Sequence, residues 1–159
     1  MSKSFNLYIG QAGHLLVMSE LLYRGWNVAT PQVDRGDDVF VVKDENGDLK
    51  RVQVKTANGK ALSRGGIKAQ FSLRLDQLET PRVPDIHYIF VIRDGDKWLD
   101  FVVIMRRELS DIEVVHKIGS RTKNKLILSM TITSQEIKCS GYSLKSYRNN
   151  WKEFPIINH

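Results

Sequence analysis

The pattern of apolar and polar positions predicts one long helix near the start of the chain, followed mainly by strands. Over residues 10–24 the apolar side chains recur at helical spacing, and Gly25 favours a stop because glycine accepts the left-handed cap conformation. Gly10 and Gly13 keep the first turns of this helix slim, which would let another backbone approach closely. At about 100° per residue, His14 shares the apolar stripe of the helix with Leu15, Val17, Met18, Leu21 and Leu22.

Two hairpins give the clearest strand signals. Residues 38–43 and 49–57 are strand-rich, and Asn46-Gly47 between them favours a tight turn. A second hairpin pairs the nearly continuous apolar run 87–93, typical of a buried strand, with residues 98–105. Further strands are expected at 26–29, 70–73, 126–133 and 136–139, helical segments at 75–78, 110–118 and 143–154, and a loop at 58–66. This order predicts an α/β or α+β fold with a mixed central sheet flanked by helices.

Length and composition suit a single globular domain. The chain has 159 residues, 42% of them hydrophobic, and no repeat or Ser/Gly linker divides it, so we expect one domain over 1–159. Lysine and arginine number 24 against 18 acidic residues, and the formal charge of +6 suits a polyanionic partner. The single cysteine, Cys139, excludes a disulfide framework and a cysteine-rich zinc site. Without an apolar run of about 20 residues or the apolar block of a secretory signal, a soluble intracellular protein with no membrane contact is expected.

Three side chains of the first hairpin have the chemistry of a catalytic site. Gln53 and Lys55 lie two apart on one strand, so both point to one face while Val54 points to the other. With the turn at Asn46-Gly47, residue 38 lies near residue 55, so Asp38 and Lys55 should be neighbours. A carboxylate, an amide oxygen and an ammonium would then meet at one end of the hairpin.

Such a group suits metal-assisted cleavage of a phosphodiester. Asp38 would bind Mg²⁺ or Mn²⁺, which prefer oxygen ligands and keep several waters. The Gln53 side-chain oxygen and the Val54 carbonyl could add ligands. Lys55 would position or deprotonate the attacking water and offset charge on the phosphorane.

The ordered motifs around this hairpin resemble the PD-(D/E)XK nuclease superfamily. They run as Gly-x-x-Gly, a helix, Arg-Gly-Trp-x-Val, then Pro31-x-x-Asp34-x-Gly-x-Asp38, and finally Arg-Val-Gln53-Val-Lys55-Thr. The similarity covers roughly the first 60 residues, within a motif core at about 10–75, and is greatest to the branch whose last motif is Gln-Val-Lys, which includes a group I intron homing endonuclease.

This resemblance implies a restriction-endonuclease-like core, which residues 85–155 would complete. It also implies a Mg²⁺-dependent DNA endonuclease that is cytoplasmic, in a bacterium or a phage-infected cell. Asp38 would be the metal-binding aspartate, Gln53 would occupy the second acidic position, and Lys55 would be the lysine.

The chain departs from the superfamily pattern at two positions. An amide, Gln53, stands where the second carboxylate is usual, which weakens the negative charge available to a metal. The first helix often carries a glutamate where this chain has His14. Glu20 is the one carboxylate of the predicted helix, and it could compensate or simply pair with Arg24 four residues on. His14 could equally be a core histidine.

Other interpretations of these residues stay open at this point. Asp34 or Asp37 could be the ligand in place of Asp38, and Lys55 could be a solvated charge at a strand edge. A basic set follows the motif and could contact DNA phosphates or only water: Lys60, Arg64, Lys68 and Arg74. Because a duplex has two strands to cut, a two-fold dimer is expected. The alternatives to an endonuclease are a catalytically inactive nucleic-acid-binding module with the same fold and a structural or partner-binding domain.

Overall fold

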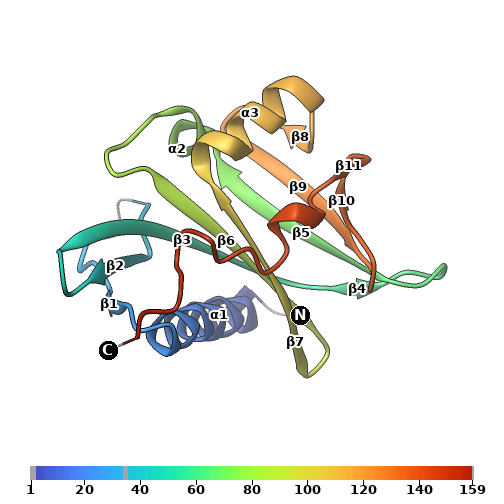
Figure 1. Ribbon diagram of the computed structural model, residues 1–159. Coiled ribbons are helices and arrows are strands. Elements are labelled where there is room, and N and C mark those ends of the chain that lie inside the picture. The colour runs from blue at the N-terminus through green and yellow to red at the C-terminus, as the bar shows by residue number, and fades with distance from the viewer. Residues whose placement is uncertain (1–2, 34–35, 159) are drawn as a thin grey trace.

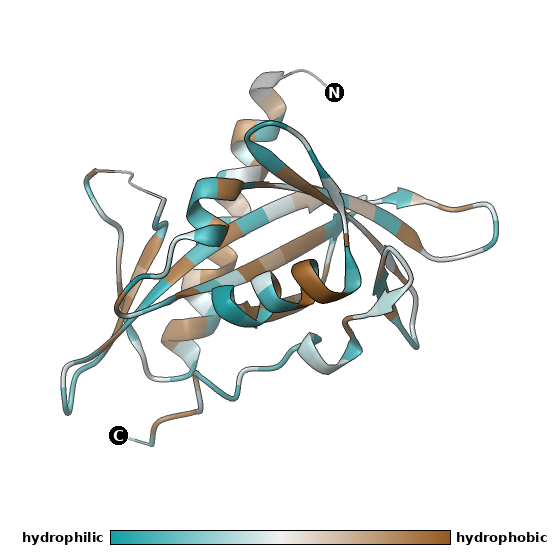
Figure 2. Ribbon diagram, turned by 90° about the horizontal axis from the view of Figure 1, so that it is seen from above, coloured by the Kyte–Doolittle hydropathy of each residue, from teal (hydrophilic) through white to brown (hydrophobic). Residues whose placement is uncertain are grey.

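Three layers make up the protein, with a mixed sheet in the middle (Figure 1). The structure is a computed structural model that describes residues 3–33 and 36–158. Helix α1 (Lys3–Tyr23) packs on one face of the mixed sheet, and a second sheet packs on the other face. In Figure 2 the apolar segments run along the strands in the middle of the molecule.

The mixed sheet contains both predicted hairpins. Its strand order is β1-β2-β3-β6-β7, and only the central pair β3 and β6 is parallel. Strand β6 has seven consecutive buried residues at its start, as expected of a strand covered on both faces. The strands are β1 (Asn27–Ala29), β2 (Val39–Lys43), β3 (Asp48–Asn58), β6 (Ile86–Asp94) and β7 (Lys97–Met105).

A second, antiparallel sheet covers the face of the mixed sheet that α1 leaves open. Its order is β11-β10-β9-β5-β4, with β8 paired to β9. Strand β5 alternates exposed and buried positions, and its Ala69, Phe71 and Leu73 enter the core between the sheets. The strands are β4 (Lys60–Ala61), β5 (Ile67–Arg74), β8 (Ser120–Arg121), β9 (Lys125–Ile132), β10 (Ile137–Cys139) and β11 (Tyr142–Ser143).

The predicted mixed α+β fold is confirmed, but several helix predictions need correction. Helix α2 (Leu75–Glu79) is where we expected it, whereas α3 (Arg106–His116) begins four residues before the Ser110 cap that the sequence suggested. The stripe predicted for α1 is partly wrong, because Leu15 and Leu22 are 57% and 54% exposed. Among the residues described, none of the helices combines the length and apolar character of a bilayer span.

The closing helix predicted at 143–154 does not form. The chain instead makes β11, a 3₁₀ turn η1 (Lys145–Tyr147) and an irregular segment. Asn149 adopts a positive φ of 50°, and its backbone N–H donates to the carbonyl of Phe101 (2.8 Å) on β7. Trp151 and Phe154 are thereby inserted into the core between α1 and the mixed sheet.

Candidate functional site

Asp38 lies at the point where β3 extends beyond its neighbour β2. Its backbone N–H donates to the carbonyl of Val52 (2.9 Å), continuing the ladder by one residue. Its Oδ2 accepts hydrogen bonds from the backbone N–H of Val54 (2.8 Å) and from the side-chain amide of Gln53. His14 Nε2, from α1, lies 3.2 Å from the same oxygen. One carboxylate oxygen therefore collects three neighbours from β3 and α1.

The predicted pairing of Asp38 with Lys55 is wrong by two residues. The hairpin turn contains four residues, 44–47, and the N–H of Gly47 closes it on the carbonyl of Lys43 (2.8 Å). Val39 consequently pairs with Val52, which places Asp38 beside Gln53. Lys55 lies two residues further along β3, on the same face of the strand as Gln53.

The two faces of β3 are divided as the sequence predicted. Val52 and Val54 pack in the core beneath α1, so Gln53 and Lys55 point to the opposite face. The N–H of Val54 points toward Asp38, and the N–H and C=O of one strand residue point to the same side. The Val54 carbonyl is therefore also directed to the Asp38 side of the strand.

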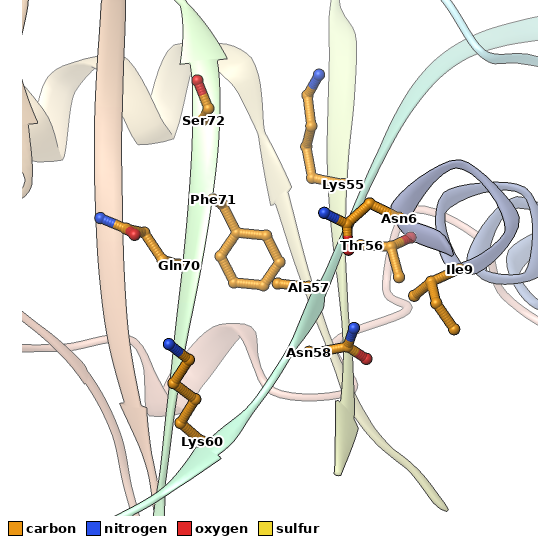
Figure 3. A pocket seen from close by; sticks show the side chains of 10 residues that line it. All are labelled: Asn6, Ile9, Lys55, Thr56, Ala57, Asn58, Lys60, Gln70, Phe71 and Ser72. Carbon is orange, nitrogen blue, oxygen red and sulfur yellow. The ribbon is translucent and has the colours of Figure 1, made fainter. Parts of the chain in front are cut away.

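Lys55 lines a pocket of about 490 Å³ between α1, β3 and β5 (Figure 3). In Figure 3 the Lys55 side chain extends away from Phe71 and Ala57, toward the end of the pocket where Ser72 lies. The wall opposite Lys55 is formed by Gln70 and Ser72, which belong to the exposed positions of β5. The pocket that Lys55 lines therefore reaches the outer face of the second sheet.

Gly13 allows α1 to approach this strand. A Cβ at Gly13 would lie 2.0 Å from Thr56 Oγ1, so only glycine fits the contact without a shift. The close approach expected from the sequence occurs at Gly13, although its nearest neighbour is the Thr56 side chain and not a backbone, and it brings the next residue, His14, to Asp38. Gly10 has open space around it instead.

A second glutamine, Gln77 of α2, completes the polar cluster. Its Nε2 donates to Gln53 Oε1 (2.9 Å) and to the backbone carbonyl of Gly36. Gln53 and Gln77 are only 5% and 4% exposed. Sequence reasoning missed Gln77, because a helix of five residues is too short for its buried face to appear as a periodic pattern. A buried amide becomes recognisable only when the fold shows what it contacts.

The other candidate carboxylates are used elsewhere. Asp37 is 4% exposed and pairs with the guanidinium of Arg51 (Nε to Oδ1, 3.1 Å). Glu20 accepts from Arg24 Nε (2.8 Å), as in the ion-pair interpretation, and it lies six residues, about 9 Å, along α1 from His14. Asp34 lies outside the described residues.

The basic residues predicted to contact DNA all lie on or beside the second sheet. Lys60, Lys68 and Arg74 are exposed on β4 and β5, and Arg64 is exposed in the loop between these strands. The six strands of this sheet, all described, contain no Asp or Glu but carry cations at Lys60, Lys68, Arg74, Arg121, Lys125 and Lys138.

Acidic neighbours neutralise two of these cations. Arg74 pairs with Asp76, and Arg121 pairs with Glu79 and Glu113. Within the described residues, none of the four lysines of the sheet forms an ion pair.

The donor set around Asp38 fits a hard divalent cation that keeps most of its waters. Among the described residues there is no group of three or more His, Cys, Asp or Glu, so a metal would depend on Asp38, the Gln53 amide and the Val54 carbonyl. Mg²⁺ and Mn²⁺ accept such sets, since water and a substrate phosphate complete their shells. Within the described residues, His14 Nε2 is a buried polar atom that forms no hydrogen bond, although it lies 3.2 Å from Asp38 Oδ2. An unsatisfied atom at this point is consistent with a site that takes a further ligand.

Comparison with known proteins finds a similarity in fold. No protein-family model and no curated protein sequence matches the chain. Among solved structures, the bacterial homing endonuclease I-Ssp6803I is similar in fold, with a TM-score of 0.52 and 20% sequence identity. The superposition covers 91% of this chain and 87% of that protein. The protein therefore has the mixed α+β fold of a nuclease of known structure.

Proposed function

We propose that the protein is a metal-dependent DNA endonuclease of the PD-(D/E)XK kind, with Gln53 in the second acidic position. The observation that carries this proposal is the contact of Asp38 with Gln53 of β3, the strand that also presents Lys55 to a pocket. The pocket opens onto a sheet without acidic residues. The similarity in fold to a homing endonuclease supports the same interpretation.

Each residue of the cluster has a definite role in this proposal. Asp38, the Gln53 side-chain oxygen and the Val54 carbonyl would hold Mg²⁺ or Mn²⁺, which when bound supplies Lewis-acid stabilisation and a water of lowered pKa. Lys55 orients the attacking water or takes its proton, and its positive charge offsets the charge that develops on the phosphate. His14 of α1 lies beside Asp38 Oδ2 and is the accessory residue of the site.

The second sheet would hold the DNA. On the outer face of β5 and β9 the side chains pair across the strands, Lys68 with Thr131, Gln70 with Ser129, Ser72 with Ile127 and Arg74 with Lys125. Lysine and arginine at the ends of this strip suit phosphates, and the hydroxyl and amide groups between them suit base edges. We therefore assign Lys60, Arg64, Lys68 and Arg74 to phosphate contacts.

Nicking of supercoiled plasmid tests the assignment of the catalytic residues. Lys55→Ala and Asp38→Asn should each lower the metal-dependent nicking rate by about 10²-fold or more, while retaining DNA binding in a gel-shift assay. Lys50→Ala is the matched control, because Lys50 lies on the same strand but near Glu153 (3.7 Å), and it should nick at the wild-type rate. Wild-type rates in both Lys55→Ala and Asp38→Asn would refute the site.

One observation favours the alternative of an inactive nucleic-acid-binding module. The Gln53 side chain turns its N–H, not its oxygen, to Asp38. The same experiment separates the two functions, because an inactive module would shift DNA in the gel without nicking it at any Mg²⁺ or Mn²⁺ concentration.

The remaining proposals concern the whole protein. We propose that residues 1–159 act as one domain and that two copies, related by a two-fold axis, cut the two strands of a duplex. We also propose that the protein acts in the cytoplasm of a bacterium or of a phage-infected cell.

A further inference from the structure

Two buried glutamines connect the Asp38 carboxylate to a backbone carbonyl through a chain of hydrogen bonds. Gln53 Nε2 donates to Asp38 Oδ2, and Gln53 Oε1 accepts from Gln77 Nε2 (2.9 Å). The second hydrogen of Gln77 Nε2 reaches the carbonyl of Gly36. Both ends of the chain, a carboxylate and a carbonyl, can only accept.

Acceptors at both ends determine the direction of the amides between them. Turning Gln53 over would place its NH₂ against the NH₂ of Gln77, where two donors face each other. Gln77 would then have to turn as well, which would leave its oxygen against the Gly36 carbonyl. A buried polar group left without a partner costs about 1–3 kcal/mol, so this hydrogen-bond network resists turning either amide over.

The consequence falls on the metal ligand set. A cation at Asp38 needs the Gln53 oxygen, whereas the present arrangement directs the Gln53 N–H to that position. The observed orientation therefore competes with metal binding, and the residue that maintains it is Gln77. Gln77 lies on α2, which no sequence pattern connects with the site.

We infer that Gln77 is a positioning residue that holds Gln53 in its metal-excluding orientation, so that loading of the site requires Gln77 to rearrange. This inference rests on the proposed function, because it assumes that Asp38 and the Gln53 oxygen bind the metal. Metal binding at Asp38 is therefore weakened twice, by the missing second carboxylate and by a Gln53 amide whose N–H faces Asp38.

Mn²⁺ binding to the DNA-free protein tests the inference independently of activity. Gln77→Met removes the amide that orients Gln53 and preserves most of the volume, so Mn²⁺ affinity, measured by electron paramagnetic resonance or calorimetry, should rise about 5- to 10-fold. Gln135→Met, at an exposed turn position, is the control and should bind Mn²⁺ as the wild type does. Gln77→Asn, one methylene shorter, withdraws the amide from Gln53 and serves the same purpose if the Met variant does not fold.

Repeating the experiment in a variant of Gln53 distinguishes an effect on the orientation of Gln53 from a general loosening of the site. In Gln53→Glu both terminal atoms are oxygens, so either orientation offers a ligand. Adding Gln77→Met to this variant should leave Mn²⁺ affinity within about 2-fold. An equal gain in Mn²⁺ affinity in both backgrounds, or no gain in the wild-type background, would overturn the inference about Gln77. The proposed function would still stand in that case, provided that Mn²⁺ binding depends on Asp38. If neither the wild type nor Gln53→Glu binds Mn²⁺, the proposed function fails, and the inference fails with it.

Discussion

His87 is a buried imidazole that the proposed chemistry does not use. It is 4% exposed, packs edge-on against Phe154 with ring centroids 5.1 Å apart, and neither ring nitrogen has a hydrogen-bond partner within the described residues. Burial, reinforced by the positive charge of Lys50, lowers the pKa of His87 to about 4, although Glu153 and Asp85 oppose the shift. The folded protein therefore holds a neutral His87 in mildly acidic solution, where the unfolded chain binds a proton.

This difference predicts a loss of stability in acid. Because the unfolded state binds more protons between the unfolded pKa of about 6.5 and the folded value of about 4, protonation of His87 favours unfolding as the pH falls. Going from pH 7 to pH 5 should cost about 2 kcal/mol through this residue, measured by urea unfolding at both pH values. His87→Leu should abolish that part of the pH dependence, whereas His116→Gln, at an exposed position, should retain it. An unchanged dependence in His87→Leu would contradict the assignment.

At the residue scale, sequence reasoning identifies the types of side chain better than their contacts. Asp38 and Gln53 are predicted at one end of the hairpin and do lie together, since strand alternation and chain reversal are local properties. The hydrogen bond between Gln53 and Gln77 cannot be predicted from the sequence, because it depends on how α2 is placed after β5. The sequence leaves His14 open between core and site, and the structure places its Nε2 near Asp38.

Among the elements, the contact of α1 with β3 is the one that shapes the site. A methyl group at Gly13 would clash with the stiff, β-branched side chain of Thr56, at 2.0 Å from Oγ1 and 2.8 Å from Cγ2. Gly13→Ala should therefore lower the free energy of unfolding by about 1–3 kcal/mol, even though alanine favours helices. Urea unfolding would measure the change.

Gly10→Ala provides the matched control for the same helix. Among the described residues, no atom beyond the local helix backbone lies within 4 Å of a Cβ added at Gly10, so the substitution should stabilise the protein by about 0.5–1 kcal/mol. Adding Thr56→Ala to Gly13→Ala should recover part of the stability, because it removes the two closest atoms. A Gly13→Ala variant as stable as Gly10→Ala would show that the helix moves aside at no cost.

The errors of element prediction have a common physical cause. Asn46-Gly47 favours a two-residue turn, but the backbone closes on Lys43 with four residues, and the register of Asp38 shifts accordingly. The expected C-terminal helix has apolar residues at plausible spacing, yet Asn149 exchanges hydrogen bonds with Phe101 and leaves the helical conformation. In both cases, contacts made in three dimensions outweigh a local preference.

For the molecule as a whole, the second sheet is the least predictable feature. Its central pair joins Ala69 of β5 to Met130 of β9, far apart in the chain, and alternation within a strand does not name its partner. Strands β5, β9 and β10 lie where the sequence predicts them, but β4, β8 and β11 and the assembly of all six into one sheet with no acidic residue are not predicted. That assembly brings Lys60, Lys68, Lys125 and Lys138 from separate strands onto one sheet, beside the pocket that Lys55 lines.

This concentration of charge makes DNA affinity depend on salt in a way that can be traced to single residues. A lysine that neutralises a phosphate releases counterions, so removing it should make the slope of log K against log salt concentration shallower by about 0.9. Lys68→Ala, on the outer face of the second sheet, should show this change and weaken binding to unrelated sequences alike. Lys152→Ala is the control, because this lysine lies near Glu108 (3.8 Å), on the C-terminal segment, and should leave the slope unchanged. Equal slopes for Lys68→Ala and the wild type would place the duplex on another face and separate DNA binding from the sheet.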